Sequence, residues 1–101
     1  CALPICLRRM LAHRLASPAA HAKTEAIIPQ FVGTGGWRVH GKTGSGALPD
    51  GRLLGWFVGW ADRRGRGVVF ARFGAGAGMS DAGGKQMREA MLAEIGALAG
   101  V

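Results

Sequence analysis

The chain has 101 residues and a net charge of +7, with 49% hydrophobic and 19% charged residues. This composition fits one small globular domain and excludes an intrinsically disordered chain, because the apolar fraction is large enough to build a core. No apolar run approaches the roughly 18 residues that span a bilayer, so we predict no membrane segment in this stretch.

Two helices are expected first. Apolar residues at near-helical spacing predict an amphipathic helix over residues 5–15. Ser17-Pro18 is a strong helix start, because serine caps the free N–H groups and proline suits the first helical position. Pro29 disfavours helical backbone just before it, so the second helix should cover residues 18–28.

Three strands and a last helix follow. Residues 37–43, 54–61 and 68–73 read as strands, and the loops between them are short and rich in turn-forming residues. Short connections predict an antiparallel meander. A glycine-rich loop then leads to a helix over residues 85–98, whose apolar face should pack on the sheet. The predicted fold class is α+β, an antiparallel sheet covered by helices.

The segment "GGWRVHGKTGSG" contains two overlapping motifs. Gly36, Gly41, Lys42 and Thr43 match the phosphate-loop pattern G-x-x-x-x-G-K-[ST]. A phosphate loop needs a helix directly after its lysine, whose first N–H groups hold the phosphates. The residues after Thr43 are Gly-Ser-Gly-Ala-Leu-Pro, which cannot start a stable helix. We therefore reject a nucleotide site here.

The second motif is the triplet Lys42-Thr43-Gly44, the K-T-G of serine enzymes that open β-lactam rings. That chemistry needs the triplet at the end of an edge strand beside a cleft. Lysine supplies a fixed positive charge, threonine offers a hydroxyl to an anionic group, and glycine leaves space for substrate along the strand. The backbone N–H of the next residue, Ser45, is placed to join an oxyanion hole.

The flanking sequence strengthens this interpretation. "GKTGSG" followed by "GWFVGW" resembles the C-terminal part of class D (oxacillinase-type) serine β-lactamases. "VVFAR" is similar to the next strand of that family, "SDAGGKQMREAMLAEI" to its terminal helix, and "SPAAHAKTEAIIP" to the helix before the K-T-G strand. The resemblance covers residues 5–98. It implies that residues 1–101 are a C-terminal portion of a β-lactamase/DD-peptidase-like domain from a periplasmic hydrolase of penicillins.

The resemblance also implies roles for individual residues. Lys42 would orient substrate and assist proton movement, Thr43 would hydrogen-bond the β-lactam carboxylate, and the Ser45 N–H would be an oxyanion donor. Arg88 in the terminal helix would pair with the same carboxylate, since a guanidinium suits that geometry. Lys85 is a competing cation, because the preceding loop can differ in length. No cofactor or metal is implied.

The family's nucleophile and base come from an S-x-x-K motif, which this stretch lacks. Its serines are Ser17, Ser45 and Ser80, and none has lysine three positions later. Without a nucleophile acylation has no chemistry, so the chain alone should be inactive. The alternative is the sensor domain of a membrane receptor, which would bind penicillin covalently without efficient turnover.

The net positive charge also suggests a nucleic-acid-binding module. The basic residues are spread along the chain, and the dense cluster Arg63-Arg64-Gly65-Arg66 falls in a predicted hairpin turn. A solvated turn explains that cluster without a partner. We therefore predict a β-lactam as the partner and no nucleic acid; the sequence makes no prediction of oligomeric state.

Overall fold

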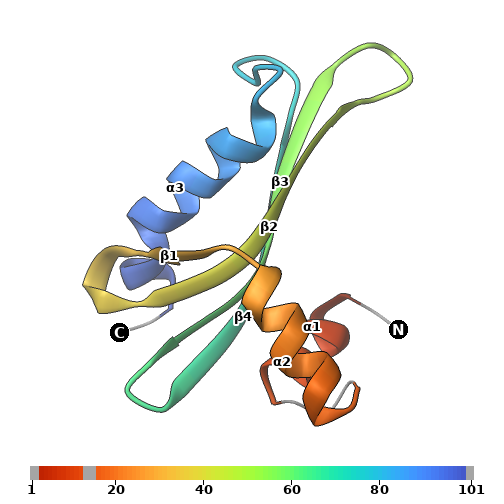
Figure 1. The fold of residues 1–101 in the computed structure, drawn as a ribbon. Coiled ribbons are helices and arrows are strands. Elements are labelled where there is room, and N and C mark those ends of the chain that lie inside the picture. The colour runs from red at the N-terminus through yellow and green to blue at the C-terminus, as the bar shows by residue number, and fades with distance from the viewer. Residues whose placement is uncertain (1–2, 13–15, 100–101) are drawn as a thin grey trace.

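The computed structural model describes residues 3–12 and 16–99, which form helices on both faces of one antiparallel sheet (Figure 1). The strand order of this sheet is β1-β2-β3-β4, the order along the chain. The predicted α+β class is confirmed. In chain order the elements are α1 (Leu3–Leu11), α2 (Pro18–Ile27), β1 (Gln30–Val32), a 3-10 turn (Thr34–Gly36), β2 (Arg38–Ala47), β3 (Leu53–Arg63), β4 (Arg66–Ala75) and α3 (Gly83–Leu98).

The helices of the N-terminal part agree with the sequence signals, apart from their exact ends. α1 begins two residues before the predicted start at residue 5 and ends at Leu11. Residues 13–15 of the predicted helix lie outside the described residues. α2 begins as expected: the Ser17 hydroxyl accepts a hydrogen bond from the Ala20 N–H at 3.1 Å, and Pro18 is the first helical residue. The backbone turns extended at Ile28, just before Pro29.

The strands are longer than predicted, and one was missed. Trp37 lies just before β2, which continues four residues past the predicted end at residue 43. Gly44, Ser45 and Gly46 stay in the strand because each has a partner in β3. The missed strand, β1, has only three residues, too few to show a periodicity, and it pairs with residues 38–40 of β2.

The β3–β4 hairpin closes through a two-residue turn. Arg64 and Gly65 have φ angles of 51° and 81°, and Arg63 pairs with Arg66 across them. Two consecutive positive φ angles give the turn a twist that matches the twist of the strands. This turn lets β3 pair with β4 from Leu54 to Arg63, along the whole of β4.

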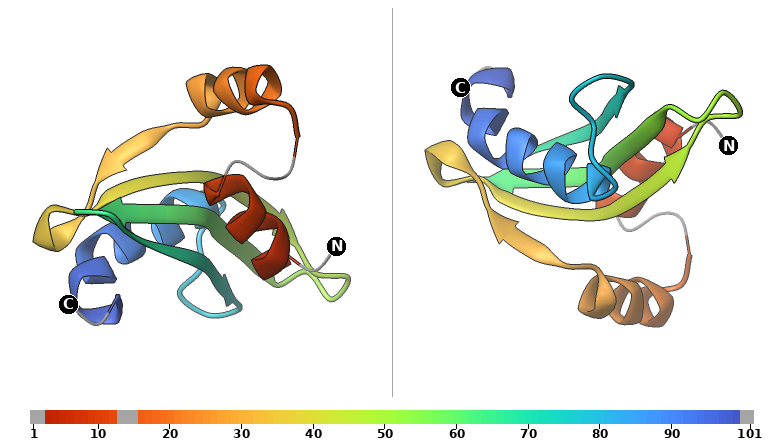
Figure 2. Two further views of the ribbon diagram at one scale, coloured as in Figure 1. Left: turned by 90° about the horizontal axis from the view of Figure 1, so that it is seen from below. Right: turned by 90° about the horizontal axis from the view of Figure 1, so that it is seen from above.

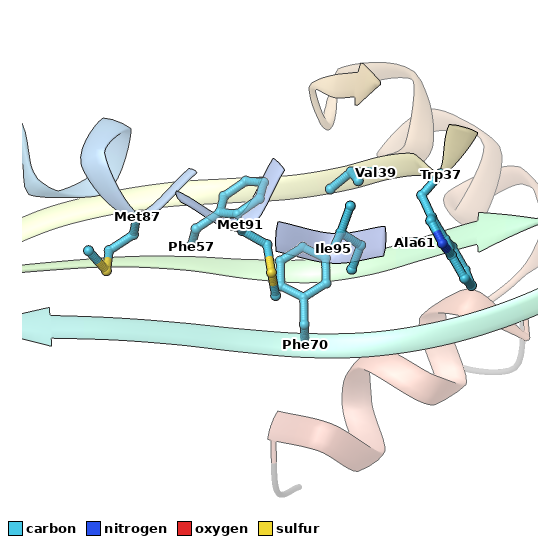
Figure 3. Close-up of a cluster of buried hydrophobic side chains, with 8 residues drawn as sticks. All are labelled: Trp37, Val39, Phe57, Ala61, Phe70, Met87, Met91 and Ile95. Carbon is cyan, nitrogen blue, oxygen red and sulfur yellow. The ribbon is translucent and has the colours of Figure 1, made fainter. Parts of the chain in front are cut away.

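The hydrophobic core lies between the sheet and α3 (Figure 3). Eight buried side chains from β2–β4, α3 and the residue before β2 form it: Trp37, Val39, Phe57, Ala61, Phe70, Met87, Met91 and Ile95. The predicted packing face of the last helix is confirmed for Met87, Met91 and Ile95, whereas Leu98 is 61% exposed. On the opposite face α1 packs against β3 and β4, and α2 lies on that same side, further from the strands (Figure 2). The sheet is therefore covered by α3 on one face and by α1 on the other.

Candidate functional site

The triplet Lys42-Thr43-Gly44 lies on an open edge of the sheet. β1 pairs with β2 only at residues 38–40. From Lys42 to Ala47, β3 is the only strand that pairs with β2 within the described part of the chain. An extended ligand can therefore lie along β2 at the triplet and reach its unpaired backbone groups.

The side chains of this segment divide between the two faces of β2. Lys42 is exposed, and its Nζ donates to the carbonyl oxygen of Thr43 at 2.9 Å. The Trp56 ring covers Gly44 on the same face, where an added Cβ would lie 2.0 Å from ring atoms. Thr43 and Ser45 point the other way, toward α3, as the alternation of a strand requires. A ligand at the open edge has access to groups from both faces.

Glycines let the first turn of α3 approach the strands directly. An added Cβ on Gly55 would lie 2.1 Å from the backbone of Gly83. One on Gly84 would lie 2.8 Å from the carbonyl oxygen of Gly44 and 3.0 Å from Cβ of Thr43. Only residues without side chains allow this approach. The helix therefore begins right beside the triplet.

The two cations assigned to carboxylate recognition both follow this contact. Lys85 is exposed and comes directly after Gly84, and Arg88 lies about one helical turn past Lys85, about 4.5 Å further along the axis. The Arg88 guanidinium stacks on the Phe31 ring, 5.0 Å from its centroid, and its side chain is 24% exposed. Arg88 also bonds Glu89 at 3.0 Å, while its Nε is buried with no hydrogen-bond partner among the described residues.

The structure thus brings Lys42, Thr43, Gly44 and Ser45 together, with the start of α3 beside them. Arg88 and Lys85 lie on the adjoining helix, but within residues 3–12 and 16–99 neither makes a hydrogen bond or ion pair with Thr43. Packing of Arg88 on Phe31 could not be foreseen, because β1 itself was missed. The phosphate-loop interpretation is excluded, since Lys42 and Thr43 lie in the middle of a strand.

A separate depression of about 560 Å³ lies on the sheet away from the triplet. His40 stacks on Trp60 there, with ring centroids 5.4 Å apart, and its Nε2 lies 3.5 Å from a carboxylate oxygen of Asp62. Arg38 bonds the same carboxylate. Spacing in the sequence gave no sign of this cluster, because the three polar residues meet only through the β2–β3 register.

The arginines of the β3–β4 turn were predicted to be solvated, and this is only partly correct. Arg63 donates to the Gly35 carbonyl at 2.9 Å and lies over the Trp37 ring, 4.9 Å from its centroid. Arg66 approaches the same ring at 5.9 Å. These two arginines cover a core tryptophan by cation–π contact, and Arg64 is exposed.

Neither a metal cluster nor a membrane-spanning helix is present in the described ranges. No three His, Cys, Asp or Glu side chains of residues 3–12 and 16–99 are grouped so that they would hold a metal ion. None of the helices in those ranges combines the length and the apolarity needed to cross a bilayer.

Comparisons with known proteins match this chain to β-lactamases. The chain is 48% identical over 103 residues to the β-lactamase OXA-9 of Klebsiella pneumoniae. The aligned stretch covers 93% of this chain and 38% of OXA-9. OXA-9 of Klebsiella aerogenes gives the same values. The crystal structure of the class D β-lactamase OXA-427 superposes on this chain with a TM-score of 0.74 and 25% sequence identity. The match covers 92% of this chain and 41% of the OXA-427 chain.

The chain thus spans well under half the length of the relatives that it matches. The resemblance to class D β-lactamases that the sequence motifs indicated is confirmed. The family model that describes the penicillin-binding protein transpeptidase domain matches residues 10–96. With the K-T-G triplet on an open strand edge and this match over most of its length, the chain belongs to the penicillin-binding protein transpeptidase domain family.

Proposed function

We propose that this chain forms the C-terminal part of a periplasmic class D serine β-lactamase, which hydrolyses penicillins through an acyl-enzyme. The observation that carries the proposal is the K-T-G triplet on an open strand edge, next to the start of α3. The likeness to OXA-9 and OXA-427 supports it. The nucleophilic serine and its base would come from outside this stretch.

Each residue of the triplet has a task that its position allows. Lys42 presents an ammonium at the open edge, where it would orient the substrate and assist proton movement at the attacking serine. The Thr43 hydroxyl would donate a hydrogen bond to the β-lactam carboxylate. Gly44 keeps the edge free of a side chain, and the N–H of Ser45 would stabilise the oxyanion that forms as the ring opens.

The test uses a chimera of OXA-9 from Klebsiella pneumoniae in which this chain replaces the stretch that matches it, hereafter the OXA-9 chimera. We expect the chimera to melt cooperatively and to hydrolyse benzylpenicillin, while the isolated 101-residue chain hydrolyses none. The rest of OXA-9 would supply the nucleophile, and this chain the second half of the site. A folded chimera without turnover would refute the proposed function.

The cation that recognises the carboxylate is tested in the same background. Replacing Arg88 by alanine should raise KM for benzylpenicillin about tenfold or more, the effect of losing a hydrogen bond to a charged group. Lys85→Ala is the matched control and should leave KM within about twofold. The reverse pattern would assign the carboxylate to Lys85 and leave Arg88 as a support for Phe31.

A further inference from the structure

The first turn of α3 is capped by a side chain from β2. The first N–H groups of any helix lack partners within the helix, and the residue before this one, Ala82, has no side-chain acceptor. The Gly84 N–H donates instead to the hydroxyl oxygen of Ser45 at 2.8 Å, across 39 positions of sequence. The cap of the helix therefore belongs to the strand that carries the triplet.

This bond adds a directional contact at the first turn of α3. At this first turn, the surfaces that meet are the bare backbones of Gly84, Gly44, Gly55 and Gly83, whereas further along the helix side chains pack into the core. Such surfaces allow close approach, but they have no side chains to interlock along the strand. The Ser45–Gly84 hydrogen bond supplies a directional restraint between this first turn and β2. The far end of α3 is held separately, by hydrogen bonds of the Thr34 hydroxyl to Ala93 and Gly96.

We propose that the Ser45 hydroxyl is a positioning group that sets the place of α3 relative to Thr43. Lys85 and Arg88 both follow Gly84, so the bond also sets the distance from Thr43 to the cation that recognises the carboxylate. The proposal rests on the proposed function and adds a side-chain role to a residue so far assigned only a backbone role. The hydroxyl touches the helix and acts on substrate only through it.

The kinetic test compares two substrates of the OXA-9 chimera, benzylpenicillin and its methyl ester. The ester lacks the negative charge that Thr43 and the helix cation would recognise. Ser45→Ala should lower kcat/KM for benzylpenicillin roughly fivefold, mostly through KM, the effect of one lost hydrogen bond. For the ester the change should stay within about twofold. Ser45→Thr keeps the hydroxyl and suits a strand, so it should restore recognition of the acid.

Ser80→Ala is the matched control. The Ser80 hydroxyl accepts from the Ala82 N–H at 3.1 Å, so it serves the same helix end, but from the adjoining loop and without a link to β2. Its removal should leave the ratio of the two kcat/KM values unchanged. Equal losses for acid and ester in Ser45→Ala would mean that the hydroxyl only stabilises the fold, and would overturn the proposal.

Hydrogen exchange separates this proposal from the proposed function. The Gly84 amide should exchange roughly fivefold faster in Ser45→Ala than in the unsubstituted chimera or in Ser80→Ala, because it loses its acceptor. Unchanged exchange would show that the cap does not hold the helix and would overturn the proposal. A chimera that hydrolyses no penicillin would refute the proposed function and the carboxylate role, while the exchange rates would still decide whether Ser45 holds α3.

Discussion

Replacing Lys42 by alanine should lower kcat/KM for benzylpenicillin by about 10²- to 10³-fold in the OXA-9 chimera. The side chain of Lys42 is exposed on the open edge of β2, and among the residues that the structure describes its Nζ bonds only the carbonyl of its neighbour Thr43. It is therefore available to a substrate and contributes little to holding the fold. Steady-state kinetics with a thermal melt will show whether activity is lost while the melting temperature is kept.

The control removes an equal charge elsewhere. Lys23 is exposed on α2, and Lys23→Ala should leave kcat/KM within about twofold. If the two alanine variants lost activity equally, the effect would come from net charge, and Lys42 would have no place in the site. A Lys42→Ala variant with full activity would exclude the K-T-G assignment altogether.

The second large effect concerns stability. Gly55→Ala would force a methyl group to within 2.1 Å of the Gly83 backbone, and a backbone cannot rotate away as a side chain can. We expect α3 to be pushed off the sheet, at a cost of about 3 kcal/mol in the free energy of unfolding. For a chimera of the length of OXA-9, of which this chain spans 38%, that lowers the melting temperature by roughly 10 °C. Differential scanning calorimetry of the OXA-9 chimera measures the shift.

Gly46→Ala provides the matched comparison, since it adds the same methyl group to β2. There the nearest atom would be a Trp56 ring carbon at 3.9 Å, an ordinary van der Waals contact. Its melting temperature should stay close to that of the unsubstituted chimera. If both alanine variants melted alike, the close contact between Gly55 and Gly83 would not exist in solution.

Most of the fold could be predicted from the sequence, because its local signals agree with the tertiary structure. Ser17-Pro18 caps α2 as such a pair should, and the turn residues between the strands give a meander. Strand ends were harder to place. Gly44-Ser45-Gly46 has little strand propensity of its own, and it is extended because β3 offers a partner to each residue.

The site was predictable only where it is local in sequence. Lys42, Thr43, Gly44 and Ser45 are consecutive, so one motif could identify all four. The capping of α3 by Ser45 joins residues 39 positions apart and depends on the glycine contact, which no pattern in the sequence encodes. The same holds for Arg88 on Phe31, which needs the register of β1 as well as the helix.

The most direct measurement is the mass of the OXA-9 chimera during reaction with benzylpenicillin, followed by rapid quenching and mass spectrometry. We predict an adduct of one intact penicillin on the serine of the S-x-x-K motif. The adduct should form in the first turnover and disappear as hydrolysed product accumulates. A cooperatively folded chimera that forms no adduct would contradict the claim that this chain supplies half of a β-lactamase active site.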